Sequence, residues 1–292
     1  MKKKIKLFCF GFGQVAKYFT ENLIKNNFNF DLVTTNTSKT EIKKFKKKKY
    51  KSFFLKDNNF DKKLIKELLS SNKILISISP KSKKDIVLNN FENFFKKNIF
   101  DWIVYLSATS VYGNKKGQWV DENTKTSPTS QRGKDRLKIE NKWLKYFKNY
   151  NLPVQIFRLA GIYSIENNVI NRLKRGKLKI VKKKNHFFSR IHVEDIAKVL
   201  TISLKKSNPG QIFNISDNHP CSNDEIAKYA AKLINVAEPK EIKIKDIKSE
   251  MLSGFYKDSK KVDNKKMKSF FRYKLKYPSY KEGLKAIKNQ SI

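Results

Sequence analysis

Cysteine and long apolar runs are both scarce in this sequence. The 292 residues include two cysteines, Cys9 and Cys221, so the chain has no disulfide framework, and this cysteine usage fits a reducing compartment. No apolar run approaches the roughly 20 residues that a membrane-spanning helix needs. Residues 1–4 resemble the basic start of a signal peptide, but Lys6 and later polar residues interrupt the apolar segment that follows. We therefore predict a cytoplasmic protein with no membrane partner.

Acidic residues and arginine are also few. Asp and Glu number 26 against 65 Lys and Arg, which gives a net charge of +39, and only seven of the basic residues are arginine. The charge is spread along the whole chain, which indicates non-specific attraction of polyanions rather than a specific nucleic-acid site. A chain so rich in lysine should keep arginine where a planar fork binds carboxylate or phosphate. The arginines predicted to bind an anionic substrate are Arg132, Arg136, Arg158 and Arg190.

Glycine is sparse too, and two of the ten glycines lie in a Gly-x-Gly-x-x-Ala segment between the apolar run 5–10 and a helix-period pattern. In such a strand-turn-helix, Gly11 allows the tight turn, Gly13 lets the backbone approach a pyrophosphate, and Ala16 allows close packing of helix and strand. Amides at the helix start then bind the phosphates. The alternative is an apolar strand followed by a chance pair of glycines. The residues predicted to contact a dinucleotide here are Gly11, Phe12, Gly13, Gln14 and Val15.

Apolar segments of strand length alternate with helix-period segments over the first 160 residues. Strands are predicted at 5–10, 30–35, 51–55, 73–79, 102–107 and 154–159, and helices at 14–26, 38–48, 60–71, 82–98 and 131–149. Such apolar strands separated by helices indicate a parallel sheet covered on both faces. Right-handed crossovers make it a Rossmann-like, doubly wound α/β fold, whose ligands bind beyond the carboxyl ends of the strands.

The pattern changes after Gly161. Short strands at 178–181 and 211–215 then mix with helices near 194–206, 222–235 and 277–288. We predict that residues 1–160 form an NAD(P)-binding Rossmann domain. Residues 161–292 are predicted to form a smaller C-terminal α/β lobe on the substrate side, partly returning to the sheet.

Four segments, 106–113, 158–163, 189–197 and 213–217, together form a family pattern. The series resembles the short-chain dehydrogenase/reductase superfamily, on its extended NAD-dependent epimerase/dehydratase side, over nearly the whole chain. The Gly-x-Gly-x-x-Ala opening and the Gly-Gln-Trp-Val-Asp-Glu loop at 117–122 are similar to its atypical YeeZ-like subgroup. The resemblance implies a nicotinamide dinucleotide as cofactor, and it is far less specific for a reaction.

The sequence lacks the residues that usually carry the chemistry of this superfamily. A Ser or Thr and a Tyr-x-x-x-Lys pair act there in proton transfer, and the resemblance places them at Ala108, Arg132 and Arg136. Ser107 and Thr109 are neighbouring hydroxyls that could substitute. The Tyr-x-x-x-Lys matches elsewhere are as many as chance gives in so lysine-rich a chain, and none lies on the helix after the fifth strand. They are Tyr112/Lys116, Tyr256/Lys260 and Tyr277/Lys281.

Arg132 and Arg136 are four residues apart and therefore share one face of the predicted helix. In the family this face points at the nicotinamide end of the cofactor. A guanidinium stays protonated and cannot act as a general base, but two of them could clamp a phosphate or carboxylate. The alternative is a pair of surface arginines bonded to Asp135 or Glu140. The catalytic residue is therefore left unknown, and the candidates are Ser107, Thr109, Arg132 and Arg136.

The end of the second strand bears on the choice of cofactor. An NAD enzyme usually places a carboxylate there for the ribose hydroxyls. This strand ends with Thr35 and Asn36, and the first cation after it is Lys39, which favours NADP over NAD. The alternative is an ordinary polar loop with Ser38 as a helix N-cap. Ser77 and Ser79, at the end of the strand 73–79, complete the predicted cofactor contacts.

His192 stands three residues before Asp195 at a strand-to-helix step. In the family this segment is chiefly structural, and we interpret His192 in that way rather than as a base. No His, Cys and carboxylate cluster has the spacing of a metal site.

Three functions remain open from the sequence. The first is an NAD(P)-binding oxidoreductase or epimerase that acts on a polar, anionic small molecule. The second is a catalytically silent dinucleotide-binding sensor or assembly protein, and the third is a polyanion binder. The helices near 82–98 and 131–149 occupy positions that form dimers in many relatives, which allows a homodimer.

Overall fold

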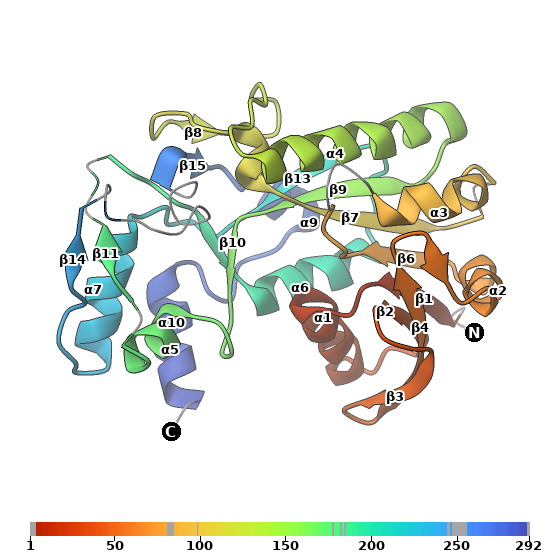
Figure 1. Cartoon of the computed structure of the whole chain (residues 1–292), viewed down its shortest axis with the longest axis horizontal. Coiled ribbons are helices and arrows are strands. Elements are labelled where there is room, and N and C mark those ends of the chain that lie inside the picture. Colours follow the sequence, from red (N-terminus) through yellow and green to blue (C-terminus); the bar gives the residue numbers. More distant parts are fainter. Residues whose placement is uncertain are drawn as a thin grey trace. The chain divides into compact units, whose positions relative to one another are not determined.

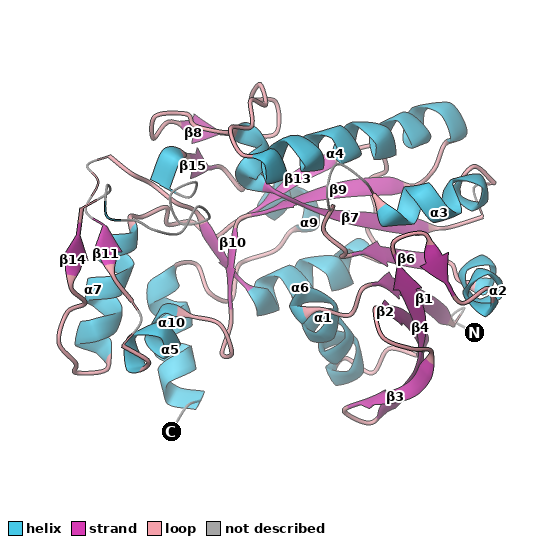
Figure 2. Cartoon of the chain, viewed as in Figure 1, coloured by secondary structure: helices cyan, strands magenta, loops and turns pink. Residues whose placement is uncertain are grey.

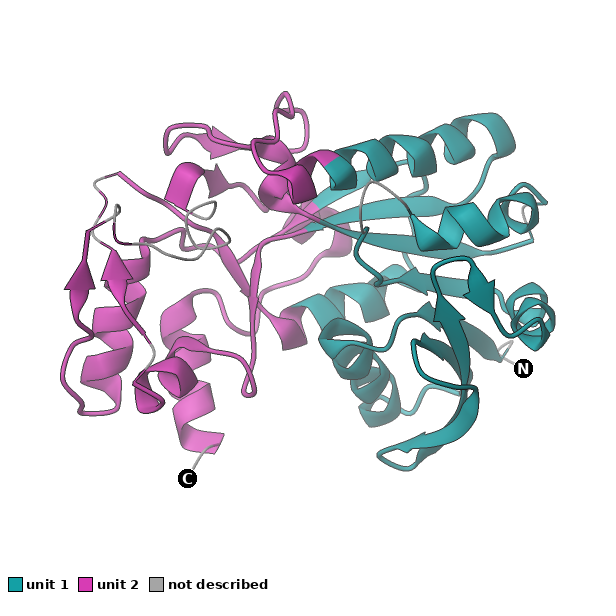
Figure 3. Ribbon diagram, viewed as in Figure 1, with its two compact units in different colours: residues 1–107, 135–158, 196–213 teal, residues 108–134, 159–195, 214–292 magenta. Residues whose placement is uncertain are grey.

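The computed structural model describes residues 4–80, 85–97, 99–176, 178–181, 183, 185–243, 246 and 256–290. The chain divides into two compact units, which Figure 3 colours separately. Unit 1 comprises residues 1–107, 135–158 and 196–213, and unit 2 comprises residues 108–134, 159–195 and 214–292. The division into domains at 160/161 stays a prediction.

Most of the central sheet lies in unit 1. Its strands follow the order β13-β9-β7-β6-β1-β2-β4-β3, with β5 paired to β4, within the described part of the chain. Neighbouring strands from β7 to β4 run parallel, as in the pairing of Phe10 with Ile76 and of Ile5 with Phe30. The strands are β1 (Ile5–Phe10), β2 (Phe30–Asn36), β3 (Glu41–Phe45), β4 (Lys48–Lys56), β5 (Asn59–Phe60), β6 (Lys73–Ile76), β7 (Trp102–Ala108), β9 (Val154–Leu159) and β13 (Ile212–Ile215).

Helices lie on both sides of this sheet (Figures 1 and 2). They are α1 (Gln14–Lys25), α2 (Lys63–Ser70), α3 (Ile86–Phe95), α4 (Gln131–Tyr150), which continues into unit 1, and α6 (Val193–Ser203). On one face, α2, α3 and α4 share a core with the strands in which Phe91 and Trp143 are fully buried. On the other face, Phe19 of α1 packs on Trp102, whose indole donates to Ser203 of α6. The predicted doubly wound α/β fold is confirmed.

The predicted helix at 38–48 is wrong. This segment is an antiparallel hairpin of β3 and β4, in which Phe45 pairs with Lys48 and the turn residue Lys46 has a φ of +54°. Ile42 and Phe45 are three residues apart, which suits a helix, but Phe45 contacts the ring of Phe12 instead. Tertiary packing therefore overrides the local pattern. Residues 82–84 and 98 of another predicted helix lie outside the described residues, and the rest contains α3.

Unit 2 is built from short elements around its own core. Tyr163, Cys221 and Tyr280 are buried there together. Asp195 near the start of α6 accepts hydrogen bonds from the Tyr273 hydroxyl and from two backbone amides at 276 and 277. The elements are β8 (Trp119–Val120), β10 (Gly161–Tyr163), β11 (Ile180–Val181), β12 (Arg190–His192), β14 (Glu241–Ile242), β15 (Lys261–Val262), α5 (Val169–Lys174), α7 (Asn223–Leu233), α9 (Lys265–Phe271) and α10 (Tyr280–Gln290).

No helix within the described ranges is both long enough and apolar enough to cross a membrane.

Candidate functional site

The turn between β1 and α1 is held in a conformation that requires glycine. Gly11 has a φ of +82°, and a Cβ there would lie 3.0 Å from Cγ1 of Ile78 and 3.1 Å from Oγ of Ser77. The Gly11 amide donates to Oγ1 of Thr35 at 2.8 Å, and the Ser77 hydroxyl donates to the Gly11 carbonyl at 3.1 Å. The predicted cofactor residues Thr35 and Ser77 thus shape the turn itself.

The space beside Gly13, at the start of α1, is open. A Cβ at this position would meet nothing within 4 Å among the described residues. Gly13 is the N-cap of α1, no side chain caps its amides, and the first turn carries no acidic residue. Ala16 is fully buried, as close packing of helix and strand requires. A helix start of this kind binds anions, so the residues present fit the pyrophosphate of a dinucleotide.

The loop after β2 is organised by the side chain of Asn36. Its Oδ1 accepts hydrogen bonds from the amides of Ser38 and Lys39 and from the Ser38 hydroxyl. Its Nδ2 donates to the Lys39 carbonyl and to Oγ of Ser52. Asn36 therefore builds the loop, and Ser38 belongs to this turn rather than to a helix N-cap. Lys39 is exposed on it.

Arg136 links the ends of two parallel strands in unit 1. Its guanidinium donates to the Leu106 carbonyl of β7 at 3.0 Å and to Oγ of Ser79, beyond the end of β6, at 2.9 Å. The hydroxyl of Ser107 is buried and has no hydrogen-bond partner among the described residues. Arg136 thus contacts the predicted cofactor residue Ser79.

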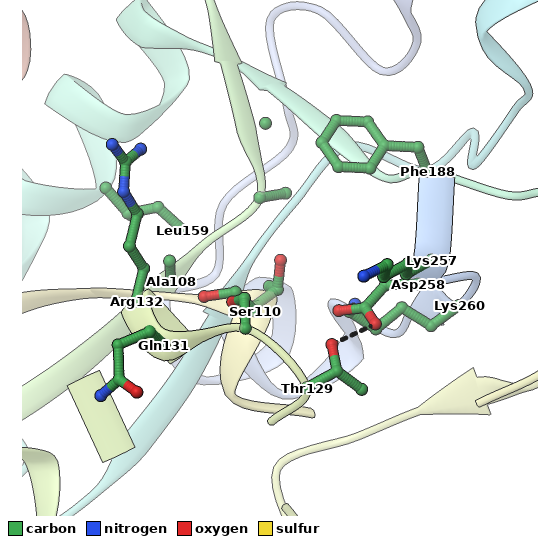
Figure 4. Close-up of a pocket in the computed structure, with 14 residues that line it drawn as sticks. Ala108, Ser110, Thr129, Gln131, Arg132, Leu159, Phe188, Lys257, Asp258 and Lys260 are labelled. Atoms are coloured by element: carbon green, nitrogen blue, oxygen red, sulfur yellow. Dashed lines mark hydrogen bonds and ion pairs between the residues drawn. The ribbon is translucent and has the colours of Figure 1, made fainter. Parts of the chain in front are cut away.

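Unit 2 contains a pocket of about 600 Å³. Figure 4 shows Arg132 on one side and Lys257, Asp258 and Lys260 on the other. The candidate Thr109 lines the pocket, and so does Ala108, where the resemblance places the catalytic hydroxyl. The lining residues are Ala108, Thr109, Ser110, Thr129, Ser130, Gln131, Arg132, Leu159, Ala160, Gly161, Phe188, Lys257, Asp258 and Lys260.

A chain of polar contacts runs along one wall of this pocket. The Thr129 hydroxyl donates to Oδ1 of Asp258 at 2.7 Å, and Nζ of Lys260 lies 3.5 Å from Oδ2 of Asp258. Lys260 also donates to the Gly113 carbonyl at 2.9 Å. Burial lowers the pKa of Lys260 from its ordinary value, and Asp258 opposes that change. The pocket therefore combines hydroxyls with three cationic side chains and one carboxylate.

Two of the four predicted substrate arginines make buried contacts within the protein. Arg158 is 3% exposed and its guanidinium binds Oε2 of Glu140 at 2.7 Å. Arg190 donates to the carbonyls of Phe188 and Cys221 and to Oδ1 of Asn223. Of the four, Arg132 is the one that lines the pocket in unit 2.

The model of the NAD dependent epimerase/dehydratase family matches residues 85–216. The predicted resemblance is confirmed. It extends to YeeZ of Escherichia coli K12, which is 33% identical over 125 residues, with 41% of this chain and 42% of YeeZ covered. A dTDP-D-glucose 4,6-dehydratase of Dictyostelium discoideum is 25% identical over 228 residues, with 63% of this chain and 51% of that protein covered. The chain thus aligns with about half or less of these curated relatives.

Solved structures of the same fold cover almost the whole chain. A functionally unknown conserved protein from Silicibacter pomeroyi is 29% identical, with a TM-score of 0.82 and 98% of each chain covered. The dTDP-glucose 4,6-dehydratase of Bacillus anthracis in complex with NAD is 17% identical, with a TM-score of 0.78, and covers 97% of this chain and 95% of its own. At 17% identity this likeness shows a shared Rossmann-type fold.

His192 is buried among aromatic rings in unit 2. Its ring lies 4.2 Å from that of Tyr277 and 5.0 Å from that of Tyr163, between centroids. Burial lowers the pKa of His192 to about 4, so the imidazole is neutral near pH 7. Within the described segments, no group of three or more His, Cys, Asp and Glu side chains could hold a metal ion.

Sequence reasoning missed Lys257, Asp258 and Lys260 as pocket residues. The sequence signal for these residues was the Tyr-x-x-x-Lys match of Tyr256 and Lys260. Such matches also arise by chance in a chain so rich in lysine. The contacts that bring Lys260 to Gly113 join residues 147 positions apart. A pattern within one short segment cannot predict a contact between residues so far apart in the sequence.

Proposed function

We propose that this protein is a nicotinamide dinucleotide-dependent enzyme of the epimerase/dehydratase type that acts on an anionic, hydroxyl-bearing small molecule. The observation that carries the proposal is the pocket of unit 2, which Arg132, Lys257 and Lys260 line together with several hydroxyls. Sugar nucleotides have this chemistry. In support, similar structures include the UDP-glucuronic acid 4-epimerase of Bacillus cereus in complex with UDP-glucuronic acid and NAD.

The dinucleotide site in this proposal is the β1–α1 turn of unit 1. Its pyrophosphate would bind at the amides after Gly13, and NADP is favoured over NAD because Lys39 follows a strand end without a carboxylate. Such a dinucleotide supplies hydride-transfer chemistry when bound. Arg136 keeps the ends of the neighbouring strands in place through Leu106 and Ser79.

The substrate in this proposal binds in unit 2 through Arg132. Its guanidinium offers several donors in a plane that suits phosphate or carboxylate. Hydroxyls of Thr109, Ser110 and Thr129 suit the hydroxyls of a sugar. A cytoplasmic location and a homodimer through α3 and α4 remain part of the same proposal.

Calorimetry tests both halves of the proposal. The protein is titrated with NADP, with NAD and with UDP-glucuronic acid as the anionic probe. Arg132→Lys should weaken binding of the probe about tenfold and leave the dinucleotide unaffected, because a point donor replaces a planar fork. Lys265→Met, at a side chain 87% exposed on α9, is the matched control. Absence of dinucleotide binding by the folded parent protein would refute the proposal.

A catalytically silent sensor is the second candidate. The observation in its favour is that Ala108 and Arg132 line the pocket where the family places a hydroxyl and a tyrosine. A sensor binds the dinucleotide but never turns it over. Steady-state NADPH oxidation with a panel of aldehydes, ketones and sugar nucleotides distinguishes the two, since any turnover above the uncatalysed rate excludes the sensor.

A further inference from the structure

Hydrogen bonds made by the main chain of Ser259 and Lys260 fix the backbone at this point of unit 2. The Lys260 amide donates to the Phe187 carbonyl at 3.2 Å, and the Ser259 carbonyl accepts from the amides of Lys115 and Gly117. Lys260 is 8% exposed in total, yet it lines the pocket. A lysine in this position has little conformational freedom, which is unusual for so long a side chain. Its ammonium is held at the pocket wall by the Gly113 carbonyl and the Asp258 carboxylate.

The surroundings of Nζ leave one hydrogen of the ammonium for the pocket. An ammonium has three N–H groups. Among the described residues, the acceptors at Nζ are the Gly113 carbonyl and the Asp258 carboxylate. Oδ1 of Asp258 is in turn held by the Thr129 hydroxyl. The remaining N–H can serve a ligand.

Several charged groups surround this ammonium. Asp258 favours its charged form, and Lys115, in the loop after Gly113, disfavours it. Arg132, at the start of α4, and Lys257 add positive charge to the pocket. The remaining walls, formed by residues 159–161 and Phe188, carry no charge. Burial beside other cations makes a lysine release its proton more readily than an exposed one.

We propose that Lys260, positioned by Asp258, is the proton-exchanging group of this pocket in place of the tyrosine that is absent at position 132. The inference rests on the proposed function for the identity of the substrate. When negative charge develops on a substrate oxygen, an N–H bond of Lys260 breaks and an O–H bond forms. The electron pair stays on Nζ, which becomes a neutral amine. The reverse transfer restores the ammonium when a substrate hydroxyl gives up its proton.

Competitive labelling with trace acetic anhydride tests the inference without any turnover. The pH dependence of acetylation at each lysine is measured by peptide mass spectrometry. Lys260 should label with a midpoint at least about one pH unit below that of the exposed lysines. Asp258→Asn should lower the midpoint further. Saturation with UDP-glucuronic acid should raise the midpoint of Lys260 and leave that of Lys265 unchanged, because a bound anion stabilises the ammonium.

A second measurement covers the case in which burial blocks the reagent. In protein labelled with ¹³C at Cε of lysine, the Lys260 resonance is assigned by its loss in Lys260→Arg and is followed during a pH titration. A midpoint equal to or above that of the exposed lysines overturns the inference, and so does a midpoint that neither Asp258→Asn nor the anion moves. These results are independent of dinucleotide binding, so failure of the proposed function is recognised separately.

A kinetic readout separates proton exchange from a structural role. Lys260→Arg keeps the charge but stays protonated, so it should bind UDP-glucuronic acid within about threefold of the parent protein. In the NADPH-dependent assay, turnover by that variant should fall at least about 100-fold, in line with the loss of general acid–base catalysis. Full turnover by Lys260→Arg would overturn the inference.

Discussion

At the scale of single residues, the two glycines of the β1–α1 turn have different tasks. Gly11 has a left-handed φ and lies against Ile78 and Ser77, so the fold requires it. Gly13 has a φ of −78° and open space around it, so the fold does not. The motif predicts both roles, and the structure shows the turn at Gly11, while the approach of a phosphate at Gly13 stays a prediction.

Gly13→Val should therefore separate binding from folding. The valine side chain would occupy the space of the pyrophosphate, and dinucleotide affinity should fall at least about 100-fold with little change in thermal stability. Gly11→Val is the matched control, and it should destabilise the fold by about 1–3 kcal/mol through backbone strain. Calorimetry and thermal unfolding measure the two effects. Unchanged affinity in a folded Gly13→Val protein would refute the site.

Asp217 gives the second prediction at this scale. It is 1% exposed, one of its carboxyl oxygens has no hydrogen-bond partner in the described part of the chain, and burial raises its pKa to about 8. Above about pH 4 the Asp217 carboxyl of the unfolded chain has lost its proton, whereas the same carboxyl in the folded protein keeps it. Stability from this group is present below about pH 4 and is lost as pH rises toward 8.

Asp217→Asn should remove that dependence. The difference in unfolding free energy between variant and parent should grow in favour of the variant from pH 4 to pH 8, by on the order of a few kcal/mol. His192 acts in the opposite direction, because its pKa is lowered to about 4 and its neutral form is favoured in the fold. Comparing the two proteins at each pH cancels His192. The unfolding free energies are measured in urea at each pH. If those of the variant and the parent protein change in parallel with pH, Asp217 does not have a raised pKa.

At the scale of elements, the loop after β2 and the hairpin that follows it show why local patterns fail. Residues 38–48 contain an apolar spacing that suits a helix. Oδ1 of Asn36, however, accepts hydrogen bonds from the amides of Ser38 and Lys39, and the segment forms a turn there. The hairpin then packs Phe45 and Tyr50 against Phe12. Parallel strands such as β1, β6 and β7, by contrast, were predictable because they are nearly continuous apolar runs, which is typical of strands buried on both faces.

Lys39 on that loop gives the prediction at this scale. Lys39→Ala should reduce NADP affinity about tenfold and leave NAD affinity unchanged, because in the proposed site this lysine would contact the 2′-phosphate that NAD lacks. Lys44→Ala, an exposed lysine of β3, is the control. Tighter binding of NAD than of NADP by the parent protein would contradict the predicted preference for NADP, which rests on the absence of a carboxylate at the end of β2.

At the scale of the whole molecule, much of unit 1 could be predicted and the pocket of unit 2 could not. The β1–α1 turn, where we propose that the dinucleotide binds, lies within one short segment of sequence. The pocket joins residues 108–132 to residues 257–260 through contacts such as Thr129 with Asp258, which are 129 positions apart. Short strands such as β8 and β15, of two residues each, leave no readable pattern for such a pairing.

The net charge of +39 gives the prediction at this scale. Binding to single-stranded DNA should fall at least about 100-fold between 50 and 200 mM salt and show no sequence preference, because counterion release supplies all of the affinity. Fluorescence anisotropy with oligonucleotides of different composition measures it. Tight, sequence-dependent binding at 200 mM salt would instead establish nucleic acid as a partner.

The strand β3 has a consequence for behaviour at high concentration. It ends the sheet within the part of the chain that the structure describes, so one side of its backbone is open there to pairing with another chain, and Ile42 on it is 72% exposed. Such an edge is a template for aggregation. Lys43, which pairs with Glu41, and the exposed Lys44 follow the apolar position, and the excess of positive charge repels an approaching second copy. Lysine acetylation would remove that repulsion and leave an adhesive edge, so the abundance of lysine also acts as protection against self-association.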